Sequence, residues 1–561
     1  MQLSQETQQD VNEVAAPTMA LGQYLVSAGL VPPVVIDYVL QKQRVEGRQL
    51  GGLLVEMGFA THQDIARCLA QQRGIPYISS DRLSMPEPQA AALFNRNVCL
   101  SKCFLPLYRD GEEIVVALGD ANPRTLDNFI FQRTGLRPRF LQGDFGRVIQ
   151  LVRQHYYFSE NPIEKLLKAE ISRLEADIDR AYSPERLLDH ILHLAVRERA
   201  TDIHLAPTAN SRTVLMRIDG VIQPMFALPP ALDRLISFIK LKAEMDVAES
   251  RLPQDGSFTA TALDSLYTIR VSTLIAEFGE RMVLRLLPER SDLDKLTDLG
   301  FLPDDVKALE KVFSRPHGLI LVTGPTGSGK STTLHAALRM QSVIERNVLT
   351  VEDPIEYRVP VACQTEVNRR AGYEFASAMR HFLRHDPDVI LVGEIRDAET
   401  ARAALDAAST GHLVLSTLHV GGIFGVVPRL RLLGVDHETI AENMVAIINQ
   451  RLVRRICSHC STEREATPVE REWLGKENCM VRYGKGCPRC RGTGYFKRLP
   501  VYEMLVLNSA LADAIAMEAP RHELRRLAAL AGMQTMAEQA RLLVLRGETT
   551  IEEIRRAVGT D

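Results

Sequence analysis

The sequence has 561 residues, of which 45% are hydrophobic and 24% charged, and a formal net charge of -3. A chain of this length holds about three to five domains. The composition is ordinary for a globular protein and excludes a mainly disordered chain. The slightly negative net charge does not indicate a protein whose overall surface binds nucleic acid. No apolar run reaches the ~18 residues of a transmembrane helix, and residues 1–10 lack a signal-peptide core. We therefore expect a cytoplasmic protein with only peripheral membrane contact.

The first predicted elements form an internal repeat. Leu21-Gly22 recurs as Leu50-Gly51, and Gln43 recurs as Gln72, at an offset of 29 residues. Each unit predicts a short amphipathic helix, a glycine stop and a second helix. A helical bundle made by duplication and a ligand-binding module are both consistent with this pattern.

The rest of the chain divides into three further segments. An expected strand at 113–118 and a helix at 145–157 complete an N-terminal domain over residues 1–157. Residues 158–182 predict a charged connecting helix. A helix followed by alternating strands and turns predicts an α+β sheet domain over 183–295. From 296 to 561, strands alternate with helices, which is typical of a parallel sheet in an α/β domain.

A phosphate-binding loop is the most specific motif of the chain. Residues 324–331, GPTGSGKS, match GxxxxGK[ST] between an apolar strand and a helix. Such a loop wraps phosphate oxygens with backbone N–H groups at a helix N-terminus. Lys330 would reach the β- and γ-phosphates of ATP, and Ser331 would ligate Mg²⁺. The predicted nucleotide-binding residues are Gly324, Pro325, Thr326, Gly327, Ser328, Gly329, Lys330, Ser331 and Thr332.

Three more expected strands carry acidic residues or histidines at their ends. Glu352 ends one, Glu394 follows an apolar run in a Walker-B-type arrangement, and His412 and His419 frame the third. Because ligands of open parallel sheets bind outside the carboxyl ends of the strands, we expect these side chains to converge on the phosphate-binding loop.

Two CxxC pairs predict a metal site. Cys457 with Cys460 and Cys487 with Cys490 are separated by 26 residues, and four thiolates can close a tetrahedral Zn²⁺ site. A redox dithiol and unpaired buried cysteines are the alternatives. We expect the site within a subdomain over residues 456–503.

Taken in order, these motifs resemble the secretion ATPase family of type II secretion systems and type IV pili. The matching segments are TDIHLAP (201–207), RIDG (217–220), AESRLPQDG (248–256), GPTGSGKSTT (324–333), TVEDPIEY (350–357), DPDVILVGEIRDAET (386–400) and TGHLVLSTLH (410–419). The match continues through Gln450 to Arg455 into the cysteines.

The resemblance implies a RecA-like ATPase and a homo-hexamer of two-lobed subunits with ATP between the lobes. Arg270 and Arg285 match second-domain arginines that reach the γ-phosphate, and Arg380, Arg384 and Arg396 match further arginines of the site. Glu352 and Glu394 would share the placing of water and Mg²⁺, and His412 and His419 would sense the γ-phosphate. The implied partners are an inner-membrane platform protein and the cytoplasmic domain of a membrane-anchored assembly protein.

The N-terminal repeat resembles a cyclic di-GMP-binding module whose units begin Arg-Leu-Gly. Here Ala20 and Gln49 stand in place of both arginines. Neither side chain can supply a bidentate contact to phosphate or guanine. The sequence therefore predicts the module's fold with weak or absent binding of the dinucleotide.

Within the resembled family, the motifs do not separate a motor for pilus assembly from a motor for type II secretion. A nucleic-acid-translocating motor is the alternative of a different class, and the absence of a basic domain counts against it. A scaffold without hydrolysis conflicts with the intact Lys330, Ser331, Glu352 and Glu394.

Overall fold

The computed structural model describes residues 19–80, 82–176, 183–229, 233–288, 295–341, 345–360 and 362–559. It divides into two compact units, one formed by the chain up to Met216 with Gln223–Pro288, the other by Arg217–Ile222 with Glu289–Asp561. The expectation for residues 1–10 and the end of the connecting helix at 177–182 lie outside the described residues.

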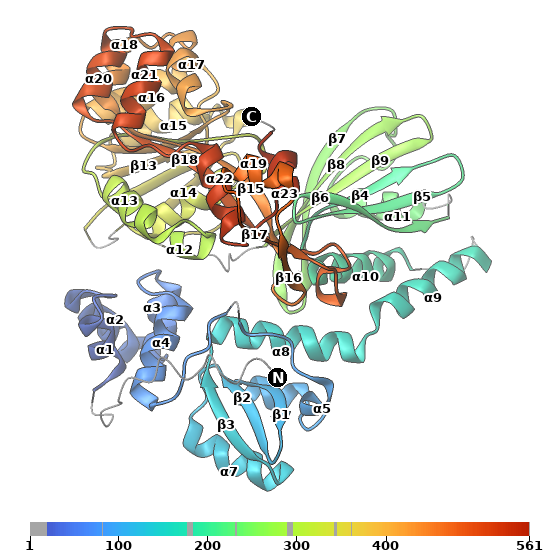
Figure 1. Ribbon diagram of the computed structural model, residues 1–561. Helices are drawn as coiled ribbons and strands as arrows, with labels where there is room; N and C mark the ends of the chain where they lie inside the picture. Colours follow the sequence, from blue (N-terminus) through green and yellow to red (C-terminus); the bar gives the residue numbers. More distant parts are fainter. Residues whose placement is uncertain are drawn as a thin grey trace. The chain divides into compact units, whose positions relative to one another are not determined.

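Four helices form the repeat at the start of the first unit (Figure 1): α1 Leu21–Ser27, α2 Pro33–Glu46, α3 Leu50–Glu56 and α4 His62–Arg73. The two halves interlock, since α1 packs against α4 and α2 against α3. A Cβ atom on Gly22 would lie 3.0 Å from Ile36 and 3.5 Å from Leu50, and one on Gly51 would lie 3.1 Å from Ile65 and 3.5 Å from Leu21. The glycines therefore allow the same close approach in both halves.

A small α/β body follows the repeat. Strand β2 pairs antiparallel with β1 and parallel with β3. Strand β2 is almost wholly apolar, and α8 covers this sheet with Val148, Leu151 and Val152. The elements are α5 Pro88–Ala91, α6 Arg96–Ser101, β1 Phe104–Asp110, β2 Glu113–Leu118, α7 Pro123–Thr134, β3 Arg137–Gln142, α8 Phe145–Glu160 and the connecting helix α9 Ile163–Ala176.

The six-stranded sheet of the first unit has the order β6-β5-β4-β9-β8-β7. Its strands alternate buried and exposed residues, as period-two side chains on a sheet with one covered face must. Helix α10 packs its apolar stripe against this sheet. The elements are α10 Pro184–Arg197, β4 Ala200–Pro207, β5 Arg212–Ile218, β6 Val221–Leu228, α11 Asp233–Lys242, β7 Gln254–Ala262, β8 Ser265–Ala276 and β9 Gly279–Pro288.

The second unit is built on a seven-stranded sheet of order β12-β11-β13-β14-β10-β15-β18. Its strands are parallel except β18, which runs antiparallel to β15 at one edge. The parallel sheet expected from the sequence is thus present, with one antiparallel strand added. The strands are β10 Gly318–Thr323, β11 Val348–Glu352, β12 Cys363–Glu366, β13 Val389–Val392, β14 Leu413–Leu418, β15 Met444–Ile456 and β18 Tyr495–Val506.

Helices cover both faces of this sheet, which explains why its central strands read as continuous apolar runs. Leu319 and Leu321 of β10 belong to one core with α15 and α16, whereas Ile320 and Val322 belong to the other with α13 and α14. The helices are α12 Leu296–Leu299, α13 Pro303–Phe313, α14 Lys330–Arg339, α15 Phe375–Phe382, α16 Ala398–Ser409, α17 Val426–Leu432, α18 His437–Asn443, α20 Ser509–Ala516 and α21 Arg521–Leu530.

A small hairpin subdomain interrupts the chain between β15 and β18. Strands β16 Ser461–Glu465 and β17 Met480–Gly484 pair antiparallel around α19 Pro468–Leu474. Their apolar residues share a core with α22 Met536–Leu545 and α23 Ile551–Ala557. The C-terminal helices therefore cover the subdomain.

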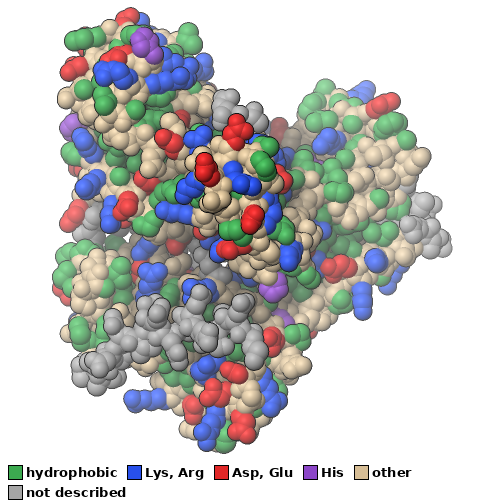
Figure 2. All heavy atoms as spheres, viewed as in Figure 1, with side chains coloured by type: hydrophobic (Ala, Val, Ile, Leu, Met, Phe, Trp, Pro, Cys, Tyr) green, Lys and Arg blue, Asp and Glu red, His purple; other side chains and the backbone are tan. Residues whose placement is uncertain are grey.

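The surface carries both signs of charge. On the face drawn in Figure 2, basic and acidic side chains are interspersed. Among the described residues, no helix is long and apolar enough to cross a membrane.

Candidate ATPase site

The phosphate-binding loop lies between β10 and α14, in the order that the sequence predicts. Gly324, Gly327 and Gly329 all have positive φ angles, of 141°, 76° and 87°, which a residue with a side chain adopts only with strain. The Nζ atom of Lys330 donates to the carbonyl oxygens of Gly324 at 3.1 Å and Pro325 at 3.0 Å, so it lies inside the loop. Burial lowers the pKa of Lys330, and the negative charge of Glu394 opposes that shift.

Gln450 of β15 fixes the loop from the neighbouring strand. Its amide Nε2 donates to the Ser328 carbonyl at 2.7 Å, and its Oε1 accepts from the Thr333 hydroxyl at 2.9 Å. A Cβ atom on Gly324 would lie 2.5 Å from the Gln450 carbonyl oxygen. The sequence motif contained Gln450 but gave it no role. Only the pairing of β10 with β15, a long-range contact, reveals that role.

The Walker-B strand β13 ends beside this loop, because β13 and β10 both pair with β14. Thr417 of β14 holds the backbone around Glu394: its hydroxyl donates to the Gly393 carbonyl at 2.8 Å, and its carbonyl accepts from the Ile395 N–H at 2.9 Å. The Glu394 side chain forms an ion pair with Arg396, and its Oε2 lies 3.4 Å from His419 Nε2.

Glu352, at the end of β11, is the most enclosed acid at this edge, with 4% of its surface exposed. Its Oε1 accepts from the Thr350 hydroxyl at 2.8 Å and the Gln364 amide at 2.9 Å, and its Oε2 lies 2.9 Å from His335 Nε2. Burial, the largest single influence, raises the pKa of Glu352, but the bonds from His335, Gln364 and Thr350 together hold it below its usual value. The carboxylate is therefore ionised and fixed.

His412 does not join these side chains. It stands before β14, at the amino end of the strand, where its carbonyl accepts from the N–H of Gly318, the first residue of β10. Its ring Nδ1 lies 2.9 Å from the Ala407 carbonyl oxygen. His419 stands at the other end, six strand residues away, or about 20 Å. Our expectation that both histidines converge on the loop is corrected for His412, because the two ends of one strand lie at opposite edges of a sheet.

The arginines expected at the site have local partners in the structure. Arg380 pairs with Glu399 at 2.6 Å, and Arg384 lies 2.7 Å from His381 Nδ1. Of these three arginines, Arg396 is the one whose described ion pair is with a predicted site acid, Glu394.

Arg270 and Arg285 lie in the first unit, directly opposite each other on β8 and β9. The register extends to Asp202 of β4, whose Oδ1 accepts from Arg285 Nε at 2.8 Å. The Arg285 side chain is 57% exposed. Two guanidinium groups therefore share one face of the sheet, with one carboxylate bound to Arg285.

The four cysteines of the CxxC pairs form one cluster in the hairpin subdomain. The Sγ–Sγ distances are 3.8 Å for Cys457 and Cys487, 3.7 Å for Cys460 and Cys490, and 3.6 Å for Cys487 and Cys490. A tetrahedral zinc ion with Zn–S bonds of about 2.3 Å places its sulfurs about 3.8 Å apart. Among the described residues these four are the only group of His, Cys, Asp and Glu close enough to hold a metal. Cys479 and His459 are not in it.

Backbone N–H groups favour the thiolate of Cys490. The N–H groups of Cys487 and Gly494 point at Cys490 Sγ, at 3.1 Å and 3.3 Å. Burial raises the pKa of Cys490, but these two bonds and those with the side chains of Cys487 and Cys460 lower it to about 7. Burial raises the pKa of Cys457, and that of Cys460 to about 12. A Cβ atom on Gly484 would lie 2.1 Å from the Gly494 carbonyl oxygen, so only glycine allows the two segments to meet there.

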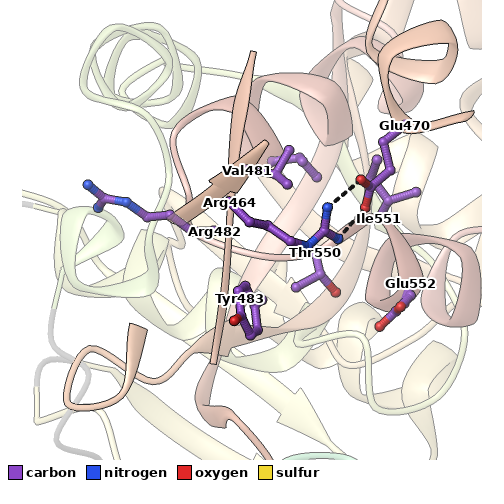
Figure 3. A pocket seen from close by; sticks show the side chains of 9 residues that line it. Arg464, Glu470, Val481, Arg482, Tyr483, Thr550, Ile551 and Glu552 are labelled. Atoms are coloured by element: carbon purple, nitrogen blue, oxygen red, sulfur yellow. Dashed lines mark hydrogen bonds and ion pairs between the residues drawn. The ribbon is translucent and has the colours of Figure 1, made fainter. Parts of the chain in front are cut away.

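A cavity of about 230 Å³ lies beside β16, β17 and α23. In Figure 3 the Arg464 guanidinium points at Glu470, which it binds through two hydrogen bonds of 2.6 Å and 2.7 Å. None of the residues lining this cavity belongs to the predicted ATPase motifs.

Comparisons with known proteins agree with this geometry. Residues 179–556 match the family model described as Type II/IV secretion system protein, and residues 73–162 match the MshEN domain. The Type IV pilus assembly ATPase PilB of Thermus thermophilus is 35% identical over 91% of this chain, which spans 59% of that relative. The Type II secretion system protein HxcR of Pseudomonas aeruginosa is 41% identical over 66% of this chain and 76% of its own length.

Among solved structures, the Legionella pneumophila ATPase DotB has the same fold, with a TM-score of 0.50 at 24% identity over 68% of this chain and 97% of its own. The predictions of the family, of the α/β fold with its preceding domains and of an ATPase are confirmed. The chain belongs to the Type II/IV secretion system protein family.

Proposed function

We propose that this protein is the cytoplasmic motor subunit that powers assembly of a pilus or a pseudopilus, working as a homo-hexamer at the inner membrane. The observation that carries the proposal is the meeting of Lys330, Glu352, Glu394 and His419 at one edge of the sheet, in a chain whose relatives are a pilus assembly ATPase and type II secretion proteins. A nucleic-acid motor is not favoured by these relatives.

The residues at this edge would divide the work of hydrolysis. ATP would lie on the backbone N–H groups of residue 324 and residues 326–329, with Lys330 on the β- and γ-phosphates and Ser331 on Mg²⁺. Glu352 and Glu394 would orient the attacking water and the water shell of Mg²⁺. His419, paired to Glu394, would report loss of the γ-phosphate, and the lobes would then shift between closed and open states.

Arg270 and Arg285 would neutralise the charge that develops on the γ-phosphate. The two residues lie directly opposite each other on neighbouring strands, so both guanidinium groups would contact the same anionic group. The exposed Arg285 side chain, anchored through its Nε to Asp202, keeps a defined orientation for such a contact.

The four cysteines would hold a structural Zn²⁺. Their spacing fits a tetrahedral S₄ site, and such closed sites stabilise folds rather than supply a reactive position. Inner-membrane partners, a platform protein and the cytoplasmic domain of an anchored assembly protein, would receive the motion of the hexamer.

The N-terminal repeat would bind cyclic di-GMP weakly or not at all. Besides the missing arginines at Ala20 and Gln49, the amides of Gln43 and Gln72 donate to the carbonyls of Arg48 at 2.8 Å and Met19 at 3.0 Å. A ligand that needs these amides must first break those bonds. Calorimetry on the full chain tests this, and a dissociation constant at or below about 1 μM would contradict it.

The function is tested in the host organism and in solution. Cells that carry only the Lys330→Ala protein should lose either surface pili or the secreted substrates of a type II system, whichever the motor serves, while cells with the normal chain keep them. The purified chain with ATP should have a mass of six times its 62.6 kDa. Cells that keep both pili and secretion with Lys330→Ala would refute the proposal.

A further inference from the structure

The Glu352 carboxylate is held by a histidine that lies outside the predicted site residues. His335 belongs to α14, five residues after Lys330 begins that helix. Its Nε2 lies 2.9 Å from Glu352 Oε2, and the two side chains are 6% and 5% exposed. In a site this dry, one hydrogen bond to a charged group has a larger effect than it would have in water.

The three donors around Glu352 are divided between its two oxygens. Thr350 and Gln364 both donate to Oε1, from β11 and β12, whereas His335 meets Oε2 from the helix. The bonds to Oε1 restrain the carboxylate from the sheet, and the bond to Oε2 restrains it from helix α14. His335 is therefore the residue that couples Glu352 to that helix.

The His335 ring is itself fixed in position. Tyr357 packs edge-on against it, with ring centroids 5.6 Å apart and an angle of 84°. The ring Nδ1 is buried without a hydrogen-bond partner among the described residues. A proton on Nδ1 would be a buried donor with no acceptor, which is unfavourable. The geometry thus favours the tautomer whose proton is on Nε2, directed at Glu352.

We propose that His335 is a positioning residue of the ATPase reaction, which holds the second oxygen of Glu352 and ties the carboxylate to the helix that begins at Lys330. The inference rests on the proposed role of Glu352 in hydrolysis. Five residues of helix span about 7.5 Å, so a shift of α14 when phosphate binds would carry the anchor of Glu352 with it. The phosphate-binding loop and the acid at the end of β11 would then move as one.

Two substitutions that differ by one methylene test this inference in the full-length chain. The amide nitrogen of Gln extends about as far from the backbone as the Nε2 of His, whereas that of Asn is one carbon shorter. We expect His335→Gln to keep kcat within about threefold. His335→Asn should lower kcat about ten- to a hundredfold, as loss of a hydrogen bond to a charged group does, with the KM for ATP unchanged. His317→Asn is the control, since His317 is an exposed histidine just before β10.

Three results would overturn the inference: wild-type kcat in His335→Asn, equal losses in the Asn and Gln variants with matching falls in Tm, or a loss seen only in the KM for ATP. Glu352→Gln separates this failure from failure of the proposed role of Glu352. If Glu352→Gln hydrolyses ATP normally, that role is wrong. If Glu352→Gln is inactive while His335→Asn is normal, only the inference about His335 falls.

Discussion

The ATPase edge and the cysteine cluster, both in the second unit, are organised in different ways. At the ATPase edge each charged side chain already has protein partners: Lys330 lies on two carbonyls, Glu352 accepts three hydrogen bonds and Glu394 pairs with Arg396. In the hairpin subdomain, four thiols face one another at 3.6–3.8 Å. Thiol groups are weak partners for each other, so the proposed zinc ion would supply the interactions that hold this arrangement.

The two sites obtain their rigidity from different sources. The ATPase edge is framed by a sheet with apolar cores on both faces. The subdomain has only a small core, shared with α22 and α23. Substitutions at the first site should therefore change the reaction and leave the fold, while loss of metal from the second should change the fold locally.

The largest effect should come from Glu394→Ala at the ATPase edge. Loss of a positioned carboxylate that orients the attacking water and the water shell of Mg²⁺ can cost up to about 10⁴-fold in rate. We expect ATP hydrolysis to fall to background while circular dichroism and Tm stay close to those of the normal chain. Steady-state ATPase assays check this. Normal turnover would show that Glu394 has no part in the reaction. Loss of the fold would show that the ATPase edge does not owe its rigidity to the sheet alone.

The double variant Arg270→Ala, Arg285→Ala asks whether the ATPase edge is complete by itself. If these arginines act on the γ-phosphate, kcat should fall by about 10³-fold or more, as for other supplied arginines, and nucleotide affinity should change little. Fluorescent-nucleotide titration beside ATPase assays measures both quantities. Wild-type hydrolysis at saturating ATP would mean that the edge needs nothing from the first unit.

Removal of metal from the cysteine cluster should have a smaller and local effect. The purified chain should contain about one zinc per chain, lost in Cys457→Ser and kept in Cys479→Ser, since Cys479 is outside the cluster. Structural zinc supplies on the order of 10–16 kcal/mol in small isolated domains. Without it, residues 457–494 should become sensitive to protease while the sheet stays folded. Elemental analysis that finds no zinc in protein purified without chelators would contradict this prediction.

The smallest effect is expected from Gln450→Leu, which keeps the volume of the side chain but removes both bonds to the phosphate-binding loop. Each bond between neutral groups contributes about 0.5–1.5 kcal/mol. Nucleotide affinity should therefore weaken about five- to a hundredfold, with kcat at saturating ATP affected less. Isothermal calorimetry decides the first point. A variant that binds nucleotide normally would show that the loop needs no support from β15.

The sequence predicted the parts of this protein that depend on local chemistry. The glycines of the phosphate-binding loop, the acids Glu352 and Glu394 and the cysteine spacing could be read directly because the residue types themselves restrict the backbone or the ligand. His412 was misplaced because a histidine before a strand and one after it look equivalent in a motif, although the direction of the strand separates them.

Other features could not be read because they depend on pairs distant in the chain. Gln450 reaches Ser328 only once β15 has paired with β10, and His335 reaches Glu352 only once α14 lies over β11. A histidine within a helical segment gives no signal by itself. The helical period fixes the side of α14 on which His335 lies. The local sequence does not show which element packs against that side.

Strand β15 places a strict rule on how this chain can change. Gln450 at the phosphate-binding loop and Cys457 at the start of the cluster are joined by that strand alone, which ends at Ile456. Side chains alternate between the two faces of a sheet. Inserting or deleting one residue between Gln450 and Cys457 would therefore turn either Gln450 or the Cys457–Cys460 pair to the opposite face. We therefore expect homologous chains with and without the CxxC pairs to differ in length only beyond residue 456. The stretch from Gln450 to Ile456 should contain no insertions in either group.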